Sequence, residues 1–293
     1  MTAPQWSIEG KGWPNAESSR FVEAGGLKWH VQVMGSGPVV LLLHGTGAAT
    51  HSWRDLAPLL AQHFTVVAPD LPGHGFTSAL RRATPTGVAT AIAALVDKLD
   101  LPPTLMVGHS AGAAIALTLA EKNLSAPRAI VSLGGALLPF PGLAGKLFPA
   151  MARLLFVNPL MPEIFAMRAR VPGEIPAFIY KSTGSRIDLR GIGFYERLMK
   201  TSGHIGGALA LMANWDLRAL EHALPTLDLP ILLAHGERDK TIPAATSHTV
   251  AARLPRGQAL ILPGLGHLAH EEAPGQHAEL ILDFARAQSL VAA

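Results

Sequence analysis

Three short segments of the chain carry residue types that could together cleave an ester or a related carbonyl bond. The first, residues 108–112 (GHSAG), places Ser110 between two glycines, where an apolar run gives way to an Ala-rich stretch. Strand, tight turn and helix in this order form a nucleophile elbow, in which the serine hydroxyl is exposed and the glycines let the flanking elements approach closely. A Gly-rich strand-to-helix connection without chemistry has the same spacing, so the pentapeptide alone leaves both interpretations open.

The other two segments supply the partners that a serine nucleophile needs. A serine hydroxyl requires a base to take its proton and a third group to orient that base. Asp239 follows the apolar run 231–234, and His267 follows the apolar run 259–262. Each loop could be a plain surface turn, since Asp and Gly are ordinary turn residues. The order serine, acid, histidine favours a triad of Ser110 as nucleophile, His267 as base and Asp239 as orienting acid.

A developing oxyanion needs backbone donors that are in place before the reaction begins. Residues 44–47 (HGTG) follow another apolar run, and the elbow ends in Ala111. We therefore predict an oxyanion hole made by the backbone N–H groups of Thr46 and Ala111. The alternative is a Gly-rich turn that binds nothing.

The remaining histidines fit other roles. His270 lies three residues after His267 and could be mistaken for the base. His109 is predicted to pack or hydrogen-bond beside the substrate rather than to act as a second base, and the loop with Asp70 and His74 is predicted to be structural. No H-x-x-x-H or H-E-x-x-H spacing occurs among the 13 histidines, so no metal is expected, and a serine triad needs no cofactor.

Strands and helices alternate along most of the chain. Residues 19–23 and 27–34 alternate around a Gly-Gly turn, which predicts an antiparallel hairpin at one sheet edge. Later apolar runs are typical of strands covered on both faces, with helical segments between them, and this pattern indicates an α/β fold with a mostly parallel, doubly wound sheet. The expected strands are residues 39–43, 65–68, 104–107, 129–133, 231–234 and 259–262. The expected helices are residues 53–62, 86–99, 110–122, 244–254 and 274–288.

The alternation breaks between residues 137 and 224, a stretch rich in Pro, Met and Phe. We predict a helical cap at 137–224, inserted after the sixth strand over a core domain of residues 1–136 and 225–293. Phe140 and Trp215 in the cap are predicted substrate contacts, because Met-rich and Phe-rich linings suit a bulky apolar ligand. The cap carries ten Lys and Arg against six Asp and Glu. This charge indicates a solvated basic face, or arginines that receive substrate carboxylates. The candidates are Arg168, Arg170, Arg186, Arg190 and Arg197.

Composition narrows the class of protein further. The 293 residues are 49% hydrophobic, which is enough for one substantial core. There is no cysteine, so a disulfide framework and a cysteine-ligated metal are excluded. The net charge of +3 comes from scattered residues, which gives nucleic-acid binding no support. No secretory signal and no run of 18 apolar residues is visible, so we expect a cytoplasmic protein without a transmembrane segment, for which peripheral membrane contact stays open.

Several motifs, in order, resemble the landmarks of the α/β-hydrolase superfamily over residues 19–288. They are HGTG at 44–47, PDLPGHG at 69–75, GHSAG at 108–112, GERD at 236–239 and GH at 266–267. Residues 42–54 and 263–274 are similar to a narrower group, the BchO family of magnesium chelatase accessory proteins in bacteria that make bacteriochlorophyll. This resemblance implies the α/β-hydrolase fold, a tetrapyrrole pathway and a magnesium chelatase component as a partner. It does not by itself specify a reaction.

Two classes of function therefore compete. The first is a serine hydrolase that acts on an ester-like bond of an apolar substrate, for which the resemblance implies a tetrapyrrole pathway. Serine at position 110 argues against epoxide hydrolases and haloalkane dehalogenases, which use aspartate there, while carbon–carbon bond hydrolases and cofactor-free haloperoxidases keep serine. The second is an accessory protein that binds a porphyrin or a chelatase component and retains an inherited triad.

Overall fold

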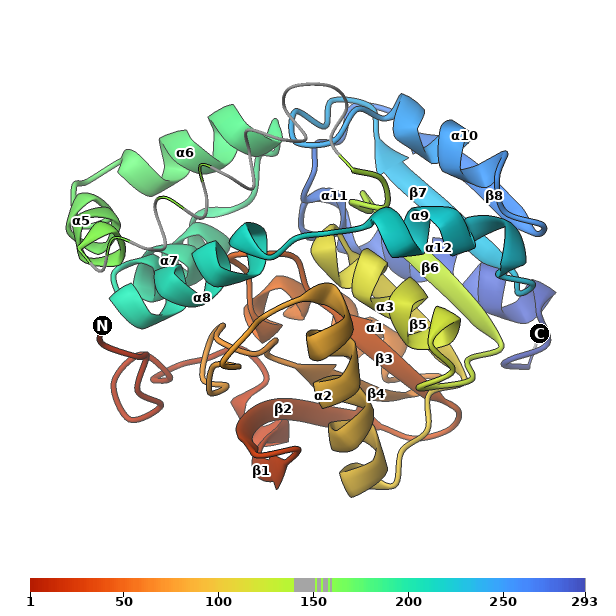
Figure 1. The fold of residues 1–293 in the computed structure, drawn as a ribbon, viewed down its shortest axis with the longest axis horizontal. Helices are drawn as coiled ribbons and strands as arrows, with labels where there is room; N and C mark the ends of the chain where they lie inside the picture. Colours follow the sequence, from red (N-terminus) through yellow and green to blue (C-terminus); the bar gives the residue numbers. More distant parts are fainter. Residues whose placement is uncertain (140–150, 152–153, 155–157, 159, 293) are drawn as a thin grey trace.

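The computed structural model describes residues 1–139, 151, 154, 158 and 160–292, and its centre is one eight-stranded sheet (Figure 1). The strand order is β1-β2-β4-β3-β5-β6-β7-β8. The strands are β1 (Ser19–Ala24), β2 (Leu27–Gly35), β3 (Val39–Leu43), β4 (Thr65–Pro69), β5 (Leu105–His109), β6 (Ala129–Leu133), β7 (Ile231–Gly236) and β8 (Gly257–Leu262). Strands β3 to β8 pair in parallel, whereas β2 is antiparallel to both β1 and β4. The predicted fold class is confirmed, including the N-terminal hairpin at the sheet edge.

The hairpin turn shows how the local sequence sets this edge. Ala24 pairs with Leu27 across a two-residue turn, and both central glycines, Gly25 and Gly26, have positive φ of 56° and 75°. Positive φ at both central positions matches the twist of the flanking strands and favours glycine.

The helices lie on both faces of the sheet and in one insertion between β6 and β7. The α-helices are α1 (Leu56–Leu60), α2 (Pro85–Leu99), α3 (Ala111–Glu121), α5 (Met161–Arg168), α6 (Glu174–Thr183), α7 (Leu189–Met199), α8 (Ser202–Ala213), α9 (Arg218–Ala223), α10 (Ala245–Ala251), α11 (Ala269–Glu272) and α12 (Pro274–Ala287). Short 3-10 helices are η1 (Ala16–Ser18), η2 (Thr50–Trp53) and η3 (Leu224–Thr226). No helix in the described ranges is both long and apolar enough to span a bilayer.

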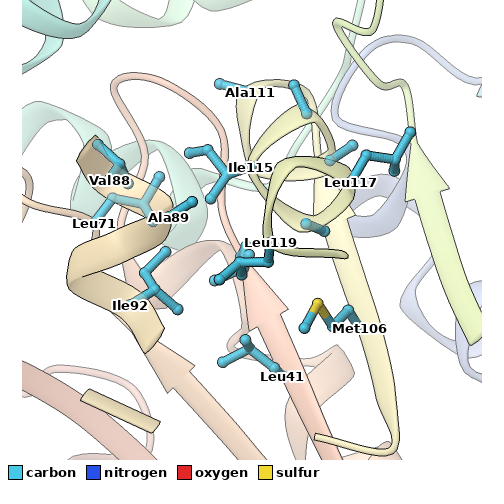
Figure 2. Packing of buried hydrophobic residues seen from close by; sticks show 14 of the residues in the cluster. Leu41, Leu71, Val88, Ala89, Ile92, Met106, Ala111, Ile115, Leu117 and Leu119 are labelled. Carbon is cyan, nitrogen blue, oxygen red and sulfur yellow. The ribbon is translucent and has the colours of Figure 1, made fainter. Parts of the chain in front are cut away.

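Alternate residues of the buried strands enter two separate cores. In β3, Leu41 and Leu43 pack with α2 and α3, while Val40 and Leu42 pack with α1 and α12. Figure 2 shows the first core, where Ile115 and Leu119 of α3 lie over the strands that carry Leu41 and Met106. A strand that is apolar on both faces is thus explained by helices on both faces.

The strand order places one crevice at the middle of the sheet. The chain passes from β3 to β4 on one side and continues with β5 on the other side of β3, so the winding direction reverses between β3 and β5. Ligands of open α/β sheets bind at the carboxyl ends of the strands at such a reversal. The loops after β3 and β5 carry Thr46 and Ser110.

Candidate active site

Ser110 lies on a strained turn between β5 and α3. Its backbone angles, φ 51° and ψ −116°, are unusual for a residue with a side chain and cost on the order of 1–3 kcal/mol. A Cβ on Gly108 would lie 2.4 Å from backbone atoms of Ala113, and one on Gly112 would lie 2.0 Å from the Leu43 carbonyl oxygen. The two glycines are therefore needed because strand, helix and neighbouring strand meet at this turn.

The loop after β3 approaches the same serine. A Cβ on Gly45 would lie 3.1 Å from the Cβ of Ser110, so this loop packs directly against the elbow. Thr46 and Ser110 are half-buried, whereas the residues on either side of each are buried. Within the described residues, the N–H groups of Thr46 and Ala111 have no hydrogen-bond acceptor in the protein. This arrangement leaves both predicted oxyanion donors available beside Ser110.

Asp239 and His267 form a close pair. Nδ1 of His267 lies 2.6 Å from Oδ2 of Asp239. Because a carboxylate only accepts, Nδ1 of a neutral imidazole carries the proton and Nε2 is left as the basic nitrogen. Oδ1 of Asp239 accepts the backbone N–H groups of Thr241 at 2.7 Å and Ile242 at 2.9 Å, which fixes the carboxylate.

His235 is a second histidine in contact with Asp239, and it was not among the predicted site residues. Nε2 of His235 faces two acceptors, Oδ2 of Asp239 at 2.9 Å and the Ile242 carbonyl at 3.0 Å, so this nitrogen carries a proton. Burial raises the pKa of Asp239, but the hydrogen bonds from His235 and His267 outweigh burial and hold that pKa well below its usual value. Asp239 is consequently ionised at neutral pH. The sequence signal for this contact was a histidine near the end of β7, four residues before Asp239.

Four neighbouring loops bring these residues to one edge of the sheet. The N–H of Ser110 donates to the Leu133 carbonyl at the end of β6. Gly134, the next residue, has φ 54°, and a Cβ there would lie 3.3 Å from Nδ1 of His267 and 3.4 Å from Oδ2 of Asp239. The turn after β6 thus lies between the elbow and the acid–histidine pair.

His109 lies beneath the site. Its side chain is 2% exposed, its Nε2–H donates to the His267 carbonyl at 3.0 Å, and its ring centroid lies 4.7 Å from that of His267. Burial lowers the pKa of His109 well below its ordinary value, so the ring is neutral. These contacts fit the packing and hydrogen-bonding role predicted for His109, while its substrate contact stays a prediction.

His270 makes a hydrogen bond with Ser52. Its Nε2 lies 2.9 Å from Oγ of Ser52, which in turn donates to Oε1 of the buried Glu271 at 2.7 Å. Burial lowers the pKa of His270 well below its ordinary value. His267, with an aspartate on Nδ1, is the better-placed base. Within the described ranges, no group of three or more His, Asp or Glu side chains could hold a metal ion.

Asp70 connects the loops that support the oxyanion turn. Its carboxylate accepts the N–H of Thr50 at 2.7 Å and that of Phe76 at 2.9 Å, and lies 2.8 Å from Nδ1 of His30. Burial raises the pKa of Asp70, but the charge and hydrogen bond of His30 lower it by more. The net pKa lies well below the usual value, so Asp70 stays ionised. These contacts match the structural role predicted for this loop.

The predicted cap residues have mixed placements. Phe140 lies outside the described residues, and Trp215 is half-buried against the core that contains α3. Arg168 pairs with Glu174 at 2.6 Å, and Arg197 donates to the carbonyls of Glu9 and Lys11. Substrate contacts from the cap therefore stay predictions.

The insertion joins the core through a buried polar cluster that sequence patterns do not reveal. The carboxylate of Glu271 accepts hydrogen bonds from the hydroxyl of Tyr195 in α7, at 2.6 Å, and from Nη1 of Arg54, at 3.0 Å. Nη2 of Arg54 lies 3.1 Å from Asp188, the N-cap of α7. Burial raises the pKa of Glu271. The cluster fixes α7 beside the loop that carries His267.

Comparisons with known proteins agree with this fold. Residues 40–280 match the model of the alpha/beta hydrolase family. The magnesium-chelatase 30 kDa subunit of Rhodobacter capsulatus is 39% identical over 93% of this chain and 96% of that protein. The pimeloyl-[acyl-carrier protein] methyl ester esterase of Xanthomonas campestris is 31% identical over 88% of this chain and 99% of that protein. An esterase structure from Thermogutta terrifontis shares the fold, with a TM-score of 0.72, 21% identity and coverage of 92% of this chain and 98% of that one.

Proposed function

Because the chain belongs to the alpha/beta hydrolase family, we propose that it is a serine hydrolase that cleaves an ester-like bond of an apolar substrate. One observation carries this proposal: the 2.6 Å contact between Asp239 and His267, on loops that converge on the strained turn of Ser110. A buried aspartate on Nδ1 orients the ring and stabilises the imidazolium that forms when a serine proton is taken.

In the proposed reaction, Ser110 Oγ attacks the substrate carbonyl while Nε2 of His267 takes its proton. The N–H groups of Thr46 and Ala111 hold the oxyanion. Collapse of the tetrahedral intermediate breaks the ester bond, and protonated His267 gives its proton to the leaving alcohol. Water then attacks the acyl group on Ser110 with His267 as base again, which releases the carboxylic acid and restores the serine.

Residues 137–224 act in this proposal as a cap domain over the core of residues 1–136 and 225–293. Helix α7 supports this assignment, because its Tyr195 is bonded to Glu271 close to His267 in the chain. The loop residue Gly47 also faces the insertion, since a Cβ on it would lie 3.3 Å from Cε of Met199. An apolar acyl or alcohol group beside Thr46 would therefore meet side chains of α7.

A fluorophosphonate probe tests the proposal, because it reacts with activated serines. We expect the wild type to be labelled and Ser110→Ala to be unlabelled. Ser125→Ala, which changes a half-buried serine beyond α3, is the control and keeps the labelling. A folded wild type that does not react would contradict the proposal. Hydrolysis of p-nitrophenyl esters of increasing chain length then measures the preference for apolar substrates.

The Rhodobacter relative, named a magnesium-chelatase subunit, suggests where the substrate belongs. We place the substrate in a tetrapyrrole pathway, since an ester-bearing tetrapyrrole is both apolar and a carbonyl substrate. Cleavage of such an ester in vitro, followed by mass spectrometry, would support this assignment. Hydrolysis restricted to small esters would contradict it.

The same relative favours a second candidate, an accessory protein that binds a porphyrin or a chelatase component. Titration with a porphyrin, monitored by absorbance, separates the two functions if wild type and Ser110→Ala are compared. Binding that is equal in both proteins, together with an unreactive Ser110, would favour the accessory role. Unchanged spectra together with probe labelling would favour the hydrolase.

A further inference from the structure

Helix α5 is apolar on two sides, and only one side is packed. Pro162 and Ala166 are buried, and Ala166 contacts Ile205 and Leu209 of α8. A second side faces solvent. It comprises Ile164 and Met167 of α5, which are 45% and 59% exposed, and Leu160 and Val171 just outside its two ends, which are 63% and 55% exposed. A surface helix ordinarily presents polar residues on that side.

Helix α6, which follows α5 in the chain, repeats the pattern. Ile175 and Ile179 are buried, whereas Phe178 and Tyr180 are 55% and 43% exposed. Figure 1 shows both helices at the outer edge of the molecule, away from the sheet. We call Leu160, Ile164, Met167, Val171, Phe178 and Tyr180 the outer apolar surface. Exposed apolar patches on a folded protein mark interaction sites.

Four cations near these helices lack carboxylate partners among the described residues: Lys181 in α6, Arg170 and Arg186 in the connections that follow α5 and α6, and Arg190 in α7. The acids of this region are already engaged, Glu163 with the N-terminus, Glu174 with Arg168, and Asp188 with Arg54. Residues 140–159 contain no Asp or Glu in their sequence. The segments that carry the outer apolar surface, and the start of α7, therefore also carry positive charge without an ion-pair partner, and we call these four residues the rim cations.

We propose that the outer apolar surface docks on an anionic lipid membrane. Apolar side chains that project from two helices can enter the boundary between headgroups and acyl chains, while rim cations contact lipid phosphates. The hydrogen bonds of both helix backbones are satisfied internally, so insertion to this depth exposes few unpaired groups. Tyr180 fits this position, because its ring lies 5.4 Å from the Arg186 guanidinium carbon and 4.9 Å from Nζ of Lys240, and such amphipathic rings favour the headgroup level.

A second copy of the chain is a poorer occupant of this surface. A two-fold dimer places the same patch against itself, so the four rim cations of one copy would meet those of the other. An anionic bilayer instead complements both the apolar centre and the basic rim. The proposal does not depend on the reaction at Ser110, because none of the surface residues belongs to that site.

Co-sedimentation of the full chain with vesicles tests the proposal. We expect binding to vesicles of 70% phosphatidylcholine and 30% phosphatidylglycerol, weak binding to pure phosphatidylcholine, and release at about 1 M salt, where the Debye length falls to about 3 Å. Ile164→Gln with Phe178→Gln should lower binding at least about tenfold. Lys181→Gln with Arg190→Gln should lower it by about fivefold for each cation removed.

The matched control is Phe21→Gln with Leu260→Gln, which changes exposed apolar residues of β1 and β8 and should leave binding unchanged. Fluorophosphonate labelling of each variant, or its thermal unfolding if the wild type is not labelled, reports folding separately. Absence of binding to anionic vesicles overturns the proposal. Binding that is unchanged in the Ile164→Gln, Phe178→Gln variant also overturns it. A protein that does not bind vesicles but forms a dimer, which these substitutions dissociate, would show that a second copy covers the surface instead.

Discussion

Helices α3 and α5 are both rich in apolar residues, but only α3 is covered on all sides. Every residue from Ala111 to Leu119 is buried, because α3 lies between the sheet and helices α2 and α9. In α5, only Pro162 and Ala166 are buried, against α8. The apolar residues of a helix thus show which surface it is able to bury. The elements packed against the helix decide how much of that surface is buried.

This difference separates the two proposed functions in space. The candidate chemistry lies where coverage is complete, since loops after β3, β5, β6, β7 and β8 converge on Ser110 and fix it. The insertion keeps a free apolar face and contacts the core near His267 through Tyr195. Substitutions in the covered region should therefore be costly, and equivalent ones in α5 should be tolerated.

The largest effect is expected for Asp239→Asn at the centre of the covered region. The amide places a donor where Nδ1–H of His267 needs an acceptor, so the ring adopts the wrong tautomer for a base. We expect kcat for p-nitrophenyl butyrate to fall by roughly 10⁴-fold. The measurement is steady-state hydrolysis, and thermal unfolding checks that the variant is folded.

A neighbouring acid provides the control for that prediction. Glu237→Gln changes a carboxylate in the same loop whose contact is the N–H of Gly264, so its rate should stay close to that of the wild type. If Asp239→Asn retained more than a tenth of the wild-type rate, Asp239 would not be the orienting acid.

The next effect is on stability, in the helix that follows the nucleophile. Ile115 is fully buried between α3 and α2 (Figure 2), and Ile115→Ala leaves a cavity there. We expect the free energy of unfolding to fall by about 2–5 kcal/mol in urea titrations. A loss below about 1 kcal/mol would mean that the core around α3 is loosely packed.

The covered region is also the part that the sequence predicts well. Apolar runs such as residues 39–43 and 129–133 become the strands β3 and β6, because each face meets a helix layer. The glycines around Ser110 predict the tight turn, since only glycine leaves room at positions 108 and 112. Local sequence is enough here because chemistry, spacing and burial agree.

Side-chain contacts were harder to predict from such patterns. His235 ends an apolar run that predicts only a buried strand, and its spacing of four residues from Asp239 was a signal too weak to predict the 2.9 Å contact that the fold makes. Arg54, Glu271 and Tyr195 lie more than 70 residues apart in the chain and meet in one buried cluster. The exposed stripe of α5 is equally invisible, since the sequence does not state which layer covers a helix.

Acid should destabilise the protein through its buried histidines. Burial lowers the pKa of His204 from 6.5 to about 4, so the unfolded chain binds its proton at higher pH than the folded chain. Its contribution to stability is present above pH 6.5 and is lost as the pH falls toward 4, by about 3 kcal/mol in total. Burial acts in the same direction on His44, His51, His74, His109 and His270.

Urea unfolding at several pH values between 7 and 5 measures this dependence. His204→Gln should flatten the slope by up to about 1.4 kcal/mol per pH unit. Glu271 opposes the trend, because burial raises its pKa and folding then favours the protonated acid. A stability that rises from pH 7 to pH 5 would show that the histidines are charged in the folded protein.

A smaller effect is expected where the two regions meet. Tyr195→Phe removes the hydroxyl that donates to Oε1 of the buried Glu271, and leaves that oxygen with one fewer partner. We expect a loss of about 1–3 kcal/mol in thermal or urea unfolding. Tyr180→Phe, an exposed tyrosine of α6, is the control and should change stability by less than about 0.5 kcal/mol. Equal losses of stability in the two variants would mean that the hydrogen bond from Tyr195 to Glu271 does not stabilise the fold.

The smallest effect is expected for Ile164→Ala, the counterpart of Ile115→Ala on the exposed side of α5. No cavity forms at a side chain that is 45% exposed, and alanine is the better helix former by a few tenths of a kcal/mol. We expect the free energy of unfolding to change by less than about 0.5 kcal/mol, while binding to anionic vesicles falls. A cost like that of Ile115→Ala would mean that Ile164 is buried in solution. The outer apolar surface would then be covered, and it could not dock on a membrane.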